Sequence, residues 1–192
     1  MNKRIILASG SPRRRELLER VGIPHEVIVS NVDETTWGNP AEQVVELAKR
    51  KADAVVQLVD ASEVIVIAAD TLVAIDGEIL GKPESDNEAF EMLKKLQGNT
   101  HMVYTGVAVL SDTNSRVFYN MAQVTFRPLS NNDIWAYIAT GEPFDKAGAY
   151  GIQEKGAVLV DHINGDFYTV MGLPIAKVCA ALIELGYDYW GM

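Results

Sequence analysis

The chain has one cysteine, three histidines and no long apolar run among its 192 residues. A single cysteine excludes an intramolecular disulfide and any zinc site built from several cysteines. His25, His101 and His162 lack the spacing of metal ligands. No apolar run reaches the roughly 18 residues that cross a bilayer, and the N-terminus lacks the pattern of a secretion signal. We therefore expect a cytoplasmic protein without a membrane partner.

Positive charge is also scarce, since 17 Lys and Arg stand against 26 Asp and Glu, for a formal net charge of −9. Such a charge disfavours nucleic acid as a partner. The cluster Arg13-Arg14-Arg15 therefore stands out against its acidic background. The length and the hydrophobic content of 48% suit one substantial core, so we expect a single domain over residues 1–192.

The arginine cluster follows an apolar segment and a turn of small residues. Arg4–Ala8 is predicted to form a strand and Pro12–Val21 a helix, with Ser11 as a suitable N-cap and Pro12 at the first helical position. The free amides and the dipole of a helix start favour an anion, and arginine offers forked donors to phosphate oxygens. This segment therefore predicts a phosphate site.

Helical spacing places Arg14 on the apolar stripe of this helix. The stripe continues at i+3, i+4 and i+7 with Leu17, Leu18 and Val21. A guanidinium on the buried side needs an anionic partner, because an unpaired buried charge is very unfavourable. The alternative to a phosphate is an internal salt bridge to a carboxylate, with Arg13 and Arg15 solvated. The segment lacks G-x-x-x-x-G-K-[ST] and is not a P-loop.

Strand and helix patterns mix without strict alternation along the rest of the chain. Asp70-Thr71 interrupts the apolar run Val64–Ile75, which predicts two strand segments. Asp76-Gly77 predicts a hairpin turn, and Asn164-Gly165 predicts a separate turn. Further strands are expected over 25–29, 101–111, 116–127 and 157–163, and helices after Asn39-Pro40 and over 86–97, 131–140 and 174–185. We therefore expect an α/β fold with a mixed sheet and helices packed on it.

Three further residues suit chemistry. Asp70 lies at the expected end of a strand, where α/β proteins place ligand-handling groups, and suits a general base or a metal ligand; the alternative is a polar residue in a bend. Glu34, in a polar loop, is either an oxygen ligand for a hard cation such as Mg²⁺ or simply solvated. Lys51 borders the apolar stripe of its helix, from which it either snorkels to solvent or reaches into a cleft.

Two glycine-containing segments complete the candidates, Gly81-Lys82-Pro83 and Asp145–Gln153. Glycines let a backbone approach a ligand closely, and Lys82 and Lys146 suit phosphates. Gln153 offers a donor and an acceptor to the edge of a base. The alternative is a surface loop with ordinary charges. Together with the acidic candidates, these groups indicate phosphoryl or nucleotidyl chemistry.

Six segments together resemble the Maf family of nucleoside triphosphate pyrophosphatases, in family order and over nearly the whole chain. They are Leu7–Arg14, Val32-Asp33-Glu34, Ala69-Asp70-Thr71, Gly81-Lys82-Pro83, Asp145–Gln153 and Met171-Gly172-Leu173-Pro174. The resemblance implies an elongated mixed β-sheet flanked by helices, two lobes around a central cleft as in Maf/ITPase-like folds, and a homodimer. It also implies cleavage of a nucleoside triphosphate between the α and β phosphates with a divalent metal cation, Mg²⁺ or Mn²⁺.

The same resemblance implies roles for individual residues. Asp70 is the implied proton acceptor that activates water, and Glu34 and Asp70 are the implied metal ligands. The implied contacts to the phosphates are Ser9, Arg13, Arg14, Lys51, Lys82 and Lys146.

Three positions resemble the family branch that acts on dTTP and UTP, namely Arg13, Thr71 and Gln153. The branch that acts on 7-methyl-GTP typically has tryptophan, glutamine and glutamate there. Ala68 and Gln97 depart from the family pattern without touching a functional group. The implied function is house-cleaning of nucleotide pools, with modified pyrimidine nucleotides as further candidates. The alternatives are a 7-methyl-GTP pyrophosphatase and a nucleotide-binding regulator of septum formation.

Overall fold

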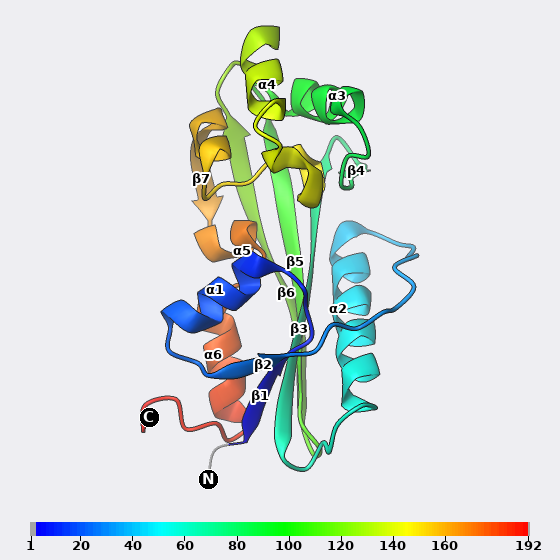
Figure 1. Cartoon of the computed structure of the whole chain (residues 1–192), viewed down its shortest axis with the longest axis vertical. Helices are drawn as coiled ribbons and strands as arrows, with labels where there is room; N and C mark the ends of the chain where they lie inside the picture. Colours follow the sequence, from blue (N-terminus) through cyan, green and yellow to red (C-terminus); the bar gives the residue numbers. More distant parts are fainter. Residues whose placement is uncertain (1–2, 192) are drawn as a thin grey trace. The chain divides into compact units, whose positions relative to one another are not determined.

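The computed structural model describes residues 3–191 (Figure 1). Within them seven strands form one mixed sheet in the order β2-β1-β3-β5-β6-β7, with β4 paired to β3. The strands are β1 (Arg4–Leu7), β2 (His25–Val27), β3 (Val64–Ile75), β4 (Glu78–Leu80), β5 (Thr100–Leu110), β6 (Ser115–Phe126) and β7 (Val160–Gly165). β1 pairs in parallel with β2 and β3, whereas β4 and β7 run antiparallel to their partners. The predicted mixed α/β fold is confirmed.

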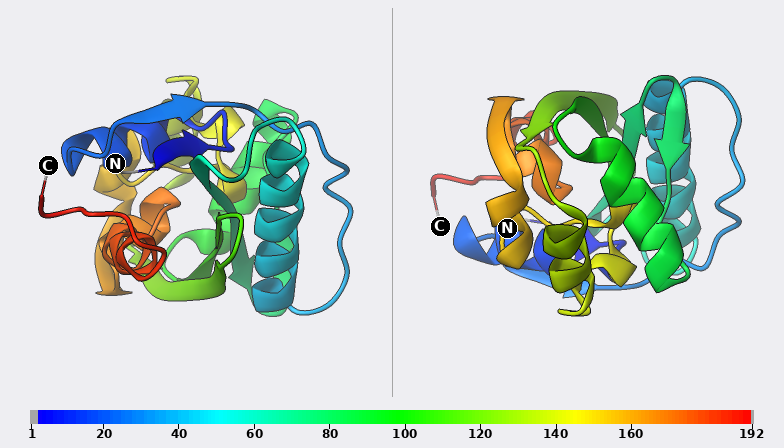
Figure 2. Two further views of the ribbon diagram at one scale, coloured as in Figure 1. Left: turned by 90° about the horizontal axis from the view of Figure 1, so that it is seen from below. Right: turned by 90° about the horizontal axis from the view of Figure 1, so that it is seen from above.

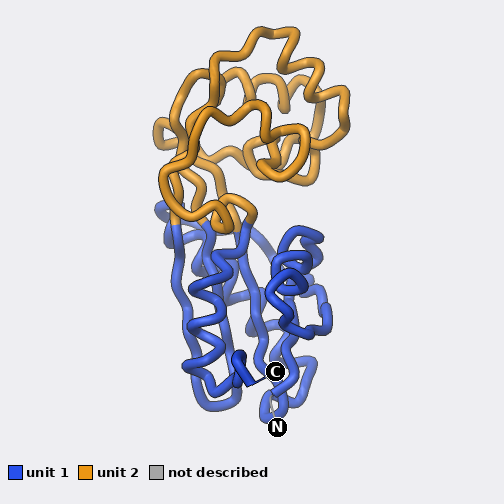
Figure 3. Tube along the Cα trace, turned by 90° about the vertical axis from the view of Figure 1, so that its left-hand side faces the viewer, with its two compact units in different colours: residues 1–70, 105–120, 172–192 blue, residues 71–104, 121–171 orange. Residues whose placement is uncertain are grey.

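The chain divides into two compact units, which Figure 3 draws in different colours. Unit 1 comprises Met1–Asp70, Thr105–Asn120 and Gly172–Met192, and unit 2 comprises Thr71–Tyr104 and Met121–Met171. The single domain over 1–192 and the cleft between two lobes stay predictions.

Unit 1 packs α1 (Pro12–Arg20), α2 (Pro40–Val56) and α6 (Ile175–Glu184) onto its strands, with α2 and α6 on opposite sides (Figure 2). α2 begins with a capping box, in which Asn39 Oδ1 accepts from the Glu42 amide at 3.0 Å and Glu42 Oε2 accepts from the Asn39 amide at 3.1 Å. Its alanines and valines form one core with β1, β3 and β5. A Cβ on Gly106 would lie 2.2 Å from the Val44 carbonyl oxygen, so only glycine lets β5 approach α2 this closely.

Unit 2 contains α3 (Asp86–Leu96), α4 (Asn131–Ile138) and α5 (Phe167–Met171), with the 3₁₀ helices η1 (Glu142–Asp145), η2 (Ala147–Ala149) and η3 (Lys155–Leu159). Ser85 caps α3 as expected, since its Oγ accepts from the Glu88 amide at 3.2 Å. Side chains from α3, α4, β5 and β6 share one core. Among the helices of residues 3–191, none is both long enough and apolar enough to cross a membrane.

Three predictions are wrong, two about strands and one about a turn. β3 runs unbroken through Asp70-Thr71, although two segments were expected, because the Asp70 carboxylate has a partner on α2 that is described below. Residues 157–159 belong to η3 rather than to a strand, and Asn164-Gly165 pairs with β6 inside β7 instead of forming a turn. Gly165 lies at φ 132° with the Cα of Ala122 3.0 Å from where its Cβ would be, so glycine here serves close strand pairing.

His101 is a buried titratable group in the core of unit 2. Its side chain is 1% exposed, its Nε2 shares a 2.8 Å hydrogen bond with the Tyr150 hydroxyl, and its ring meets the Phe126 and Tyr150 rings edge-on. Within residues 3–191 its Nδ1 has no hydrogen-bond partner. Burial lowers the pKa of His101 from 6.5 to about 4.

We predict that the protein loses stability at His101 as the pH falls from about 6.5 to about 4, because in this window the unfolded chain binds a proton there and the folded chain does not. At pH 4.5 this shift corresponds to about 2–3 kcal/mol of unfolding free energy. Urea unfolding at pH 7 and pH 4.5 measures the loss, which His101→Gln should reduce by that amount. His162→Gln, at an exposed histidine, should keep the wild-type loss. An equal loss in both variants would contradict the prediction.

Candidate functional site

Arg14 organises the turn between β1 and α1. Its Nε donates to the Gly172 carbonyl at 2.8 Å and its Nη1 donates to the Ser9 Oγ at 2.9 Å. Ser9 is 8% exposed, and its Oγ also accepts from the Ser11 amide at 3.3 Å. Arg14 therefore lies on the inward side of α1, as its spacing predicts, and joins the turn after β1 to the segment before α6.

The charge of Arg14 is balanced by acidic neighbours from the same unit. Burial lowers the pKa of the Arg14 guanidinium, the carboxylates of Asp70 and Glu34 oppose this effect, and the charge of Arg13 adds to it. Arginine does not lose its proton in proteins, so the group stays charged. The turn thus holds a fixed positive charge near two carboxylates.

Lys51 is the centre of the site in unit 1. Its Nζ lies 2.7 Å from Asp70 Oδ1 and 2.7 Å from Glu34 Oε1. The Lys51 and Asp70 side chains are 13% and 12% exposed, whereas Glu34 is 62% exposed. Of the two alternatives for Lys51, the structure shows the inward one. The Nζ of Lys51 on α2 therefore contacts two carboxylates, that of Asp70 on β3 and that of Glu34 in the loop before α2.

This arrangement suits a hard divalent cation. Since both carboxylate oxygens contact one nitrogen, they lie no farther apart than twice 2.7 Å. Mg²⁺ commonly binds through one or two carboxylates and completes its shell with water and substrate phosphates. Residues 3–191 hold no cluster of three or more His, Cys, Asp or Glu side chains suited to a metal. Glu34 and Asp70 are therefore a donor pair of the kind that Mg²⁺ uses, and not a complete protein cage.

The other predicted residues belong to α1 or to unit 2, and Thr71 directly follows Asp70 in β3. Arg13 is half-buried on α1. Thr71, Lys82, Lys146 and Gln153 belong to unit 2, where Lys82 is exposed and the other three are half-buried. Lys146 Nζ donates to the Glu142 carbonyl at 2.7 Å and lies 2.6 Å from Asp145 Oδ1. Their contacts with a substrate stay predictions.

Two contacts near the predicted residues were not predicted from the sequence. The Gly172 carbonyl accepts from Arg14, and a backbone acceptor leaves no residue-type signal. Glu142 is a carboxylate only 9% exposed, next to the Gly-rich segment. The one local signal is that Glu142 stands between Gly141 and Pro143, two residue types that are common in turns.

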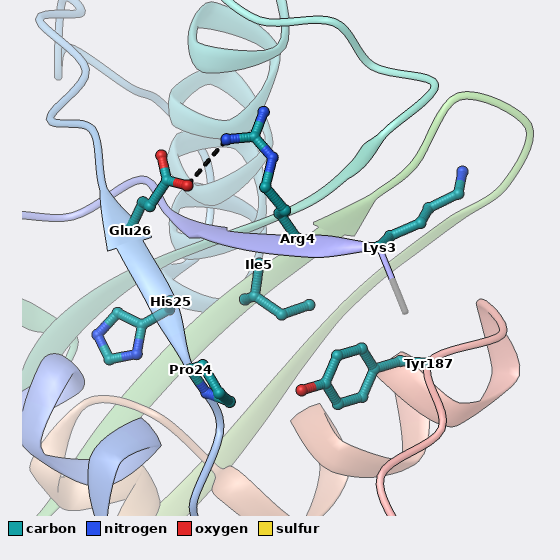
Figure 4. Close-up of a pocket in the computed structure, with 7 residues that line it drawn as sticks. All are labelled: Lys3, Arg4, Ile5, Pro24, His25, Glu26 and Tyr187. Atoms are coloured by element: carbon teal, nitrogen blue, oxygen red, sulfur yellow. Dashed lines mark hydrogen bonds and ion pairs between the residues drawn. The ribbon is translucent and has the colours of Figure 1, made fainter. Parts of the chain in front are cut away.

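A cavity of about 480 Å³ lies at the opposite end of β1 from Ser9 (Figure 4). It is lined by Lys3, Arg4, Ile5, Pro24, His25, Glu26 and Tyr187, and the Arg4–Glu26 ion pair of 2.8 Å lies on its wall. The cavity is at the amino ends of the parallel strands β1 and β2, whereas ligands of such sheets bind at the carboxyl ends. None of the predicted site residues lines it. It is therefore separate from the site of Lys51.

We predict that Arg14→Lys lowers the free energy of unfolding by about 1–2 kcal/mol, because one ammonium cannot replace both the Nε and the Nη1 contacts. Urea unfolding at pH 7 measures the change. Arg15→Lys is the matched control and should leave stability nearly unchanged. Arg15 is exposed, and its ion pair with Glu19 is long, at 3.9 Å from Nε to Oε1. Equal effects of the two substitutions would show that the Arg14 contacts do not hold the turn.

Comparison with known proteins identifies the family of the chain. The family model described as Maf-like protein matches residues 4–185. A dTTP/UTP pyrophosphatase of Bacillus thuringiensis subsp. konkukian (strain 97-27) is 50% identical over 188 residues, which cover 97% of each chain. A dTTP/UTP pyrophosphatase of Bacillus cytotoxicus is 53% identical over 182 residues, which cover 94% of each chain.

The fold has a solved counterpart of low sequence identity. The structure of a HAM1 protein from Coxiella burnetii superposes with a TM-score of 0.50 at 15% identity, and the match covers 95% of this chain and 99% of that one. This likeness supports the fold alone. The family match and the two relatives extend over nearly the full length, and on that basis the chain belongs to the Maf family.

Proposed function

We propose that this chain is a nucleoside triphosphate pyrophosphatase that hydrolyses dTTP and UTP to the monophosphate and pyrophosphate. The observation that carries the proposal is the meeting of Lys51, Asp70 and Glu34 in a chain whose relatives, half identical to it, are named dTTP/UTP pyrophosphatases. Arg13, Thr71 and Gln153, the residues of the pyrimidine branch, support the choice of substrate.

Asp70 is suited to act as the base. Its carboxylate accepts the proton of an attacking water, whose oxygen forms a bond to the α-phosphorus while the bond to the oxygen bridging to the β-phosphorus breaks and pyrophosphate leaves. Lys51 orients the carboxylate through its 2.7 Å contact. Arg14 supplies fixed positive charge near the same carboxylate, which offsets charge on a polyphosphate.

We also propose that Glu34 and Asp70 bind a divalent cation, Mg²⁺ or Mn²⁺. The cation would neutralise charge on the phosphate oxygens as a Lewis acid. Both carboxylates already contact the Lys51 ammonium, which supports their use as a site for positive charge. Lys51 would then share these carboxylates with the cation.

The biological setting is part of the proposal. Removal of surplus or modified pyrimidine nucleotides fits the branch that the chain resembles. The homodimer and the cytoplasmic location stay predictions, because neither the single chain nor the family match tests them.

We predict that Asp70→Asn lowers kcat for dTTP by about 10²–10⁴-fold, the usual contribution of a positioned base. The amide keeps the shape of the side chain and should keep the fold, as a melting curve would show. Pyrophosphate release with Mg²⁺, and its loss with a chelator, measures activity. Asp53→Asn, at an exposed carboxylate of α2, is the control and should retain full activity. Turnover of Asp70→Asn like that of the wild type would exclude Asp70 as the base.

We predict that Gln153→Glu lowers kcat/KM for dTTP and UTP about tenfold more than for ATP, because the carboxylate lacks the amide's donor. The panel for wild type and variant contains dTTP, UTP, ATP, GTP and 7-methyl-GTP. A wild-type preference for 7-methyl-GTP would overturn the choice of substrate. Nucleotide binding without pyrophosphate release from any member would favour the regulator over the enzyme.

A further inference from the structure

Residues 151–156, here called the Gln153 loop, form a loop of unit 2 whose two ends lie side by side. A Cβ on Gly156 would lie 2.2 Å from the Gly151 carbonyl oxygen, so the two ends of the loop are in backbone contact and position 156 requires glycine. Gly151 and Gly156 are buried, while Gln153 between them is half-buried. The loop is therefore closed at its neck and carries Gln153 away from the neck.

Two buried side chains hold the neck together. Glu142 Oε1 accepts from the Gly156 amide at 3.1 Å and from the Tyr137 hydroxyl at 3.0 Å, and Glu142 Oε2 accepts from the Lys155 amide at 3.0 Å. The Tyr137 hydroxyl in turn accepts from the Gly151 amide at 3.1 Å. One carboxylate and one hydroxyl thus bind both ends of the loop.

We call the side chains of Glu142 and Tyr137 together the clamp. Each of their three side-chain oxygens has a hydrogen-bond partner. Glu142 is 9% exposed and Tyr137 is 5% exposed, and a buried carboxylate is unfavourable unless donors surround it. Here it has three donors, two of them backbone amides that cannot rotate away. Burial raises the pKa of Tyr137, so its hydroxyl stays protonated and keeps donating to Glu142. Hydrogen bonds to an ionised acceptor are stronger than neutral ones, so the clamp is stiff.

The same clamp places a second predicted substrate contact. The Lys146 Nζ donates to the Glu142 carbonyl at 2.7 Å. A Cβ on Gly151 would lie 2.5 Å from the Lys146 Cε, so the lysine stem crosses the neck of the loop where glycine leaves room. Glu142 therefore positions Lys146 through its carbonyl and the Gln153 loop through its carboxylate.

We propose that Glu142 and Tyr137 are positioning residues for nucleotide selection, which hold the Gln153 loop in the one shape that presents the Gln153 amide to a pyrimidine base. The proposal rests on the proposed function. An amide discriminates between bases only when its donor and acceptor are fixed, because a mobile loop adjusts to the wrong base and loses ordering entropy on binding the right one. The two residues act through Gln153 and not on the reacting atoms.

Tyr137→Phe tests the proposal, because it removes the hydroxyl and keeps the ring. The substitution removes the hydrogen bonds of the hydroxyl to Glu142 and to the Gly151 amide, so KM for dTTP and UTP should rise about tenfold, with kcat changed by less than about threefold. Selectivity for dTTP over ATP should fall by a similar factor. Tyr189→Phe is the matched control, since it removes a hydroxyl that donates at 2.9 Å to the Val21 carbonyl in unit 1, and it should leave KM and selectivity unchanged. A wild-type KM and selectivity in Tyr137→Phe would overturn the proposal.

A double-mutant cycle separates positioning from general stabilisation. In a Gln153→Ala background, Tyr137→Phe should change selectivity by less than about twofold, because the residue through which it acts is absent. The same tenfold loss in both backgrounds would assign Tyr137 a structural role only, and would also overturn the proposal. Melting curves of all variants confirm that the fold is kept.

Hydrogen exchange and nucleotide binding keep this proposal distinct from the proposed function. In Tyr137→Phe the amides of Gly151, Lys155 and Gly156 should exchange about tenfold faster, while those of β1 should not change. If the wild type releases no pyrophosphate, the proposed function fails, and selectivity is then measured by calorimetric binding of dTTP, UTP and ATP with the same expected tenfold loss. Unchanged exchange at these three amides, or unchanged binding selectivity, would overturn the clamp itself.

Discussion

The ion pair between Lys51 and Asp70 is the interaction on which the rest of the site depends. Asp70 lies inside a twelve-residue strand, directly after six buried apolar residues, so its carboxylate is stable there only with a partner. α2 supplies that partner at 2.7 Å. The same ammonium holds Glu34 and with it the loop before α2. One nitrogen therefore pairs a carboxylate inside a strand with one from a loop and brings together the groups suited to chemistry.

Two carboxylates are buried within residues 3–191, and their hydrogen-bond donors differ. Asp70 is held by the long side chain of Lys51, whose bonds can rotate. Glu142 is held by two backbone amides and a hydroxyl, whose positions are set by the fold. A carboxylate held by a side chain that can move is suited to take part in a reaction. A carboxylate held by backbone amides is suited to keep a loop in place. The chemistry of the donors, more than burial itself, separates the two roles.

Local signals predicted much of this structure. Capping residues and apolar periodicity identified α1, α2 and α3, and helical spacing placed Arg14 on the inward side. Contacts between distant residues were beyond such signals. Asp70 looked like a break in a strand because its partner lies 19 residues away on a helix. Glu142 gave only a weak local signal, since the groups that surround it are two backbone amides and a tyrosine hydroxyl.

The absence of a side chain at Gly106 has a mechanical consequence. Here β5 and α2 touch through backbone atoms, next to Val44 and two helical turns before Lys51. A contact of this kind has no rotamers that absorb a displacement, so the spacing between helix and sheet is as rigid as the polypeptide itself. The distance from α2 to the sheet, and with it the position of Lys51, therefore depends on glycine at position 106. A redesign of this enzyme for another temperature or substrate has to keep that glycine.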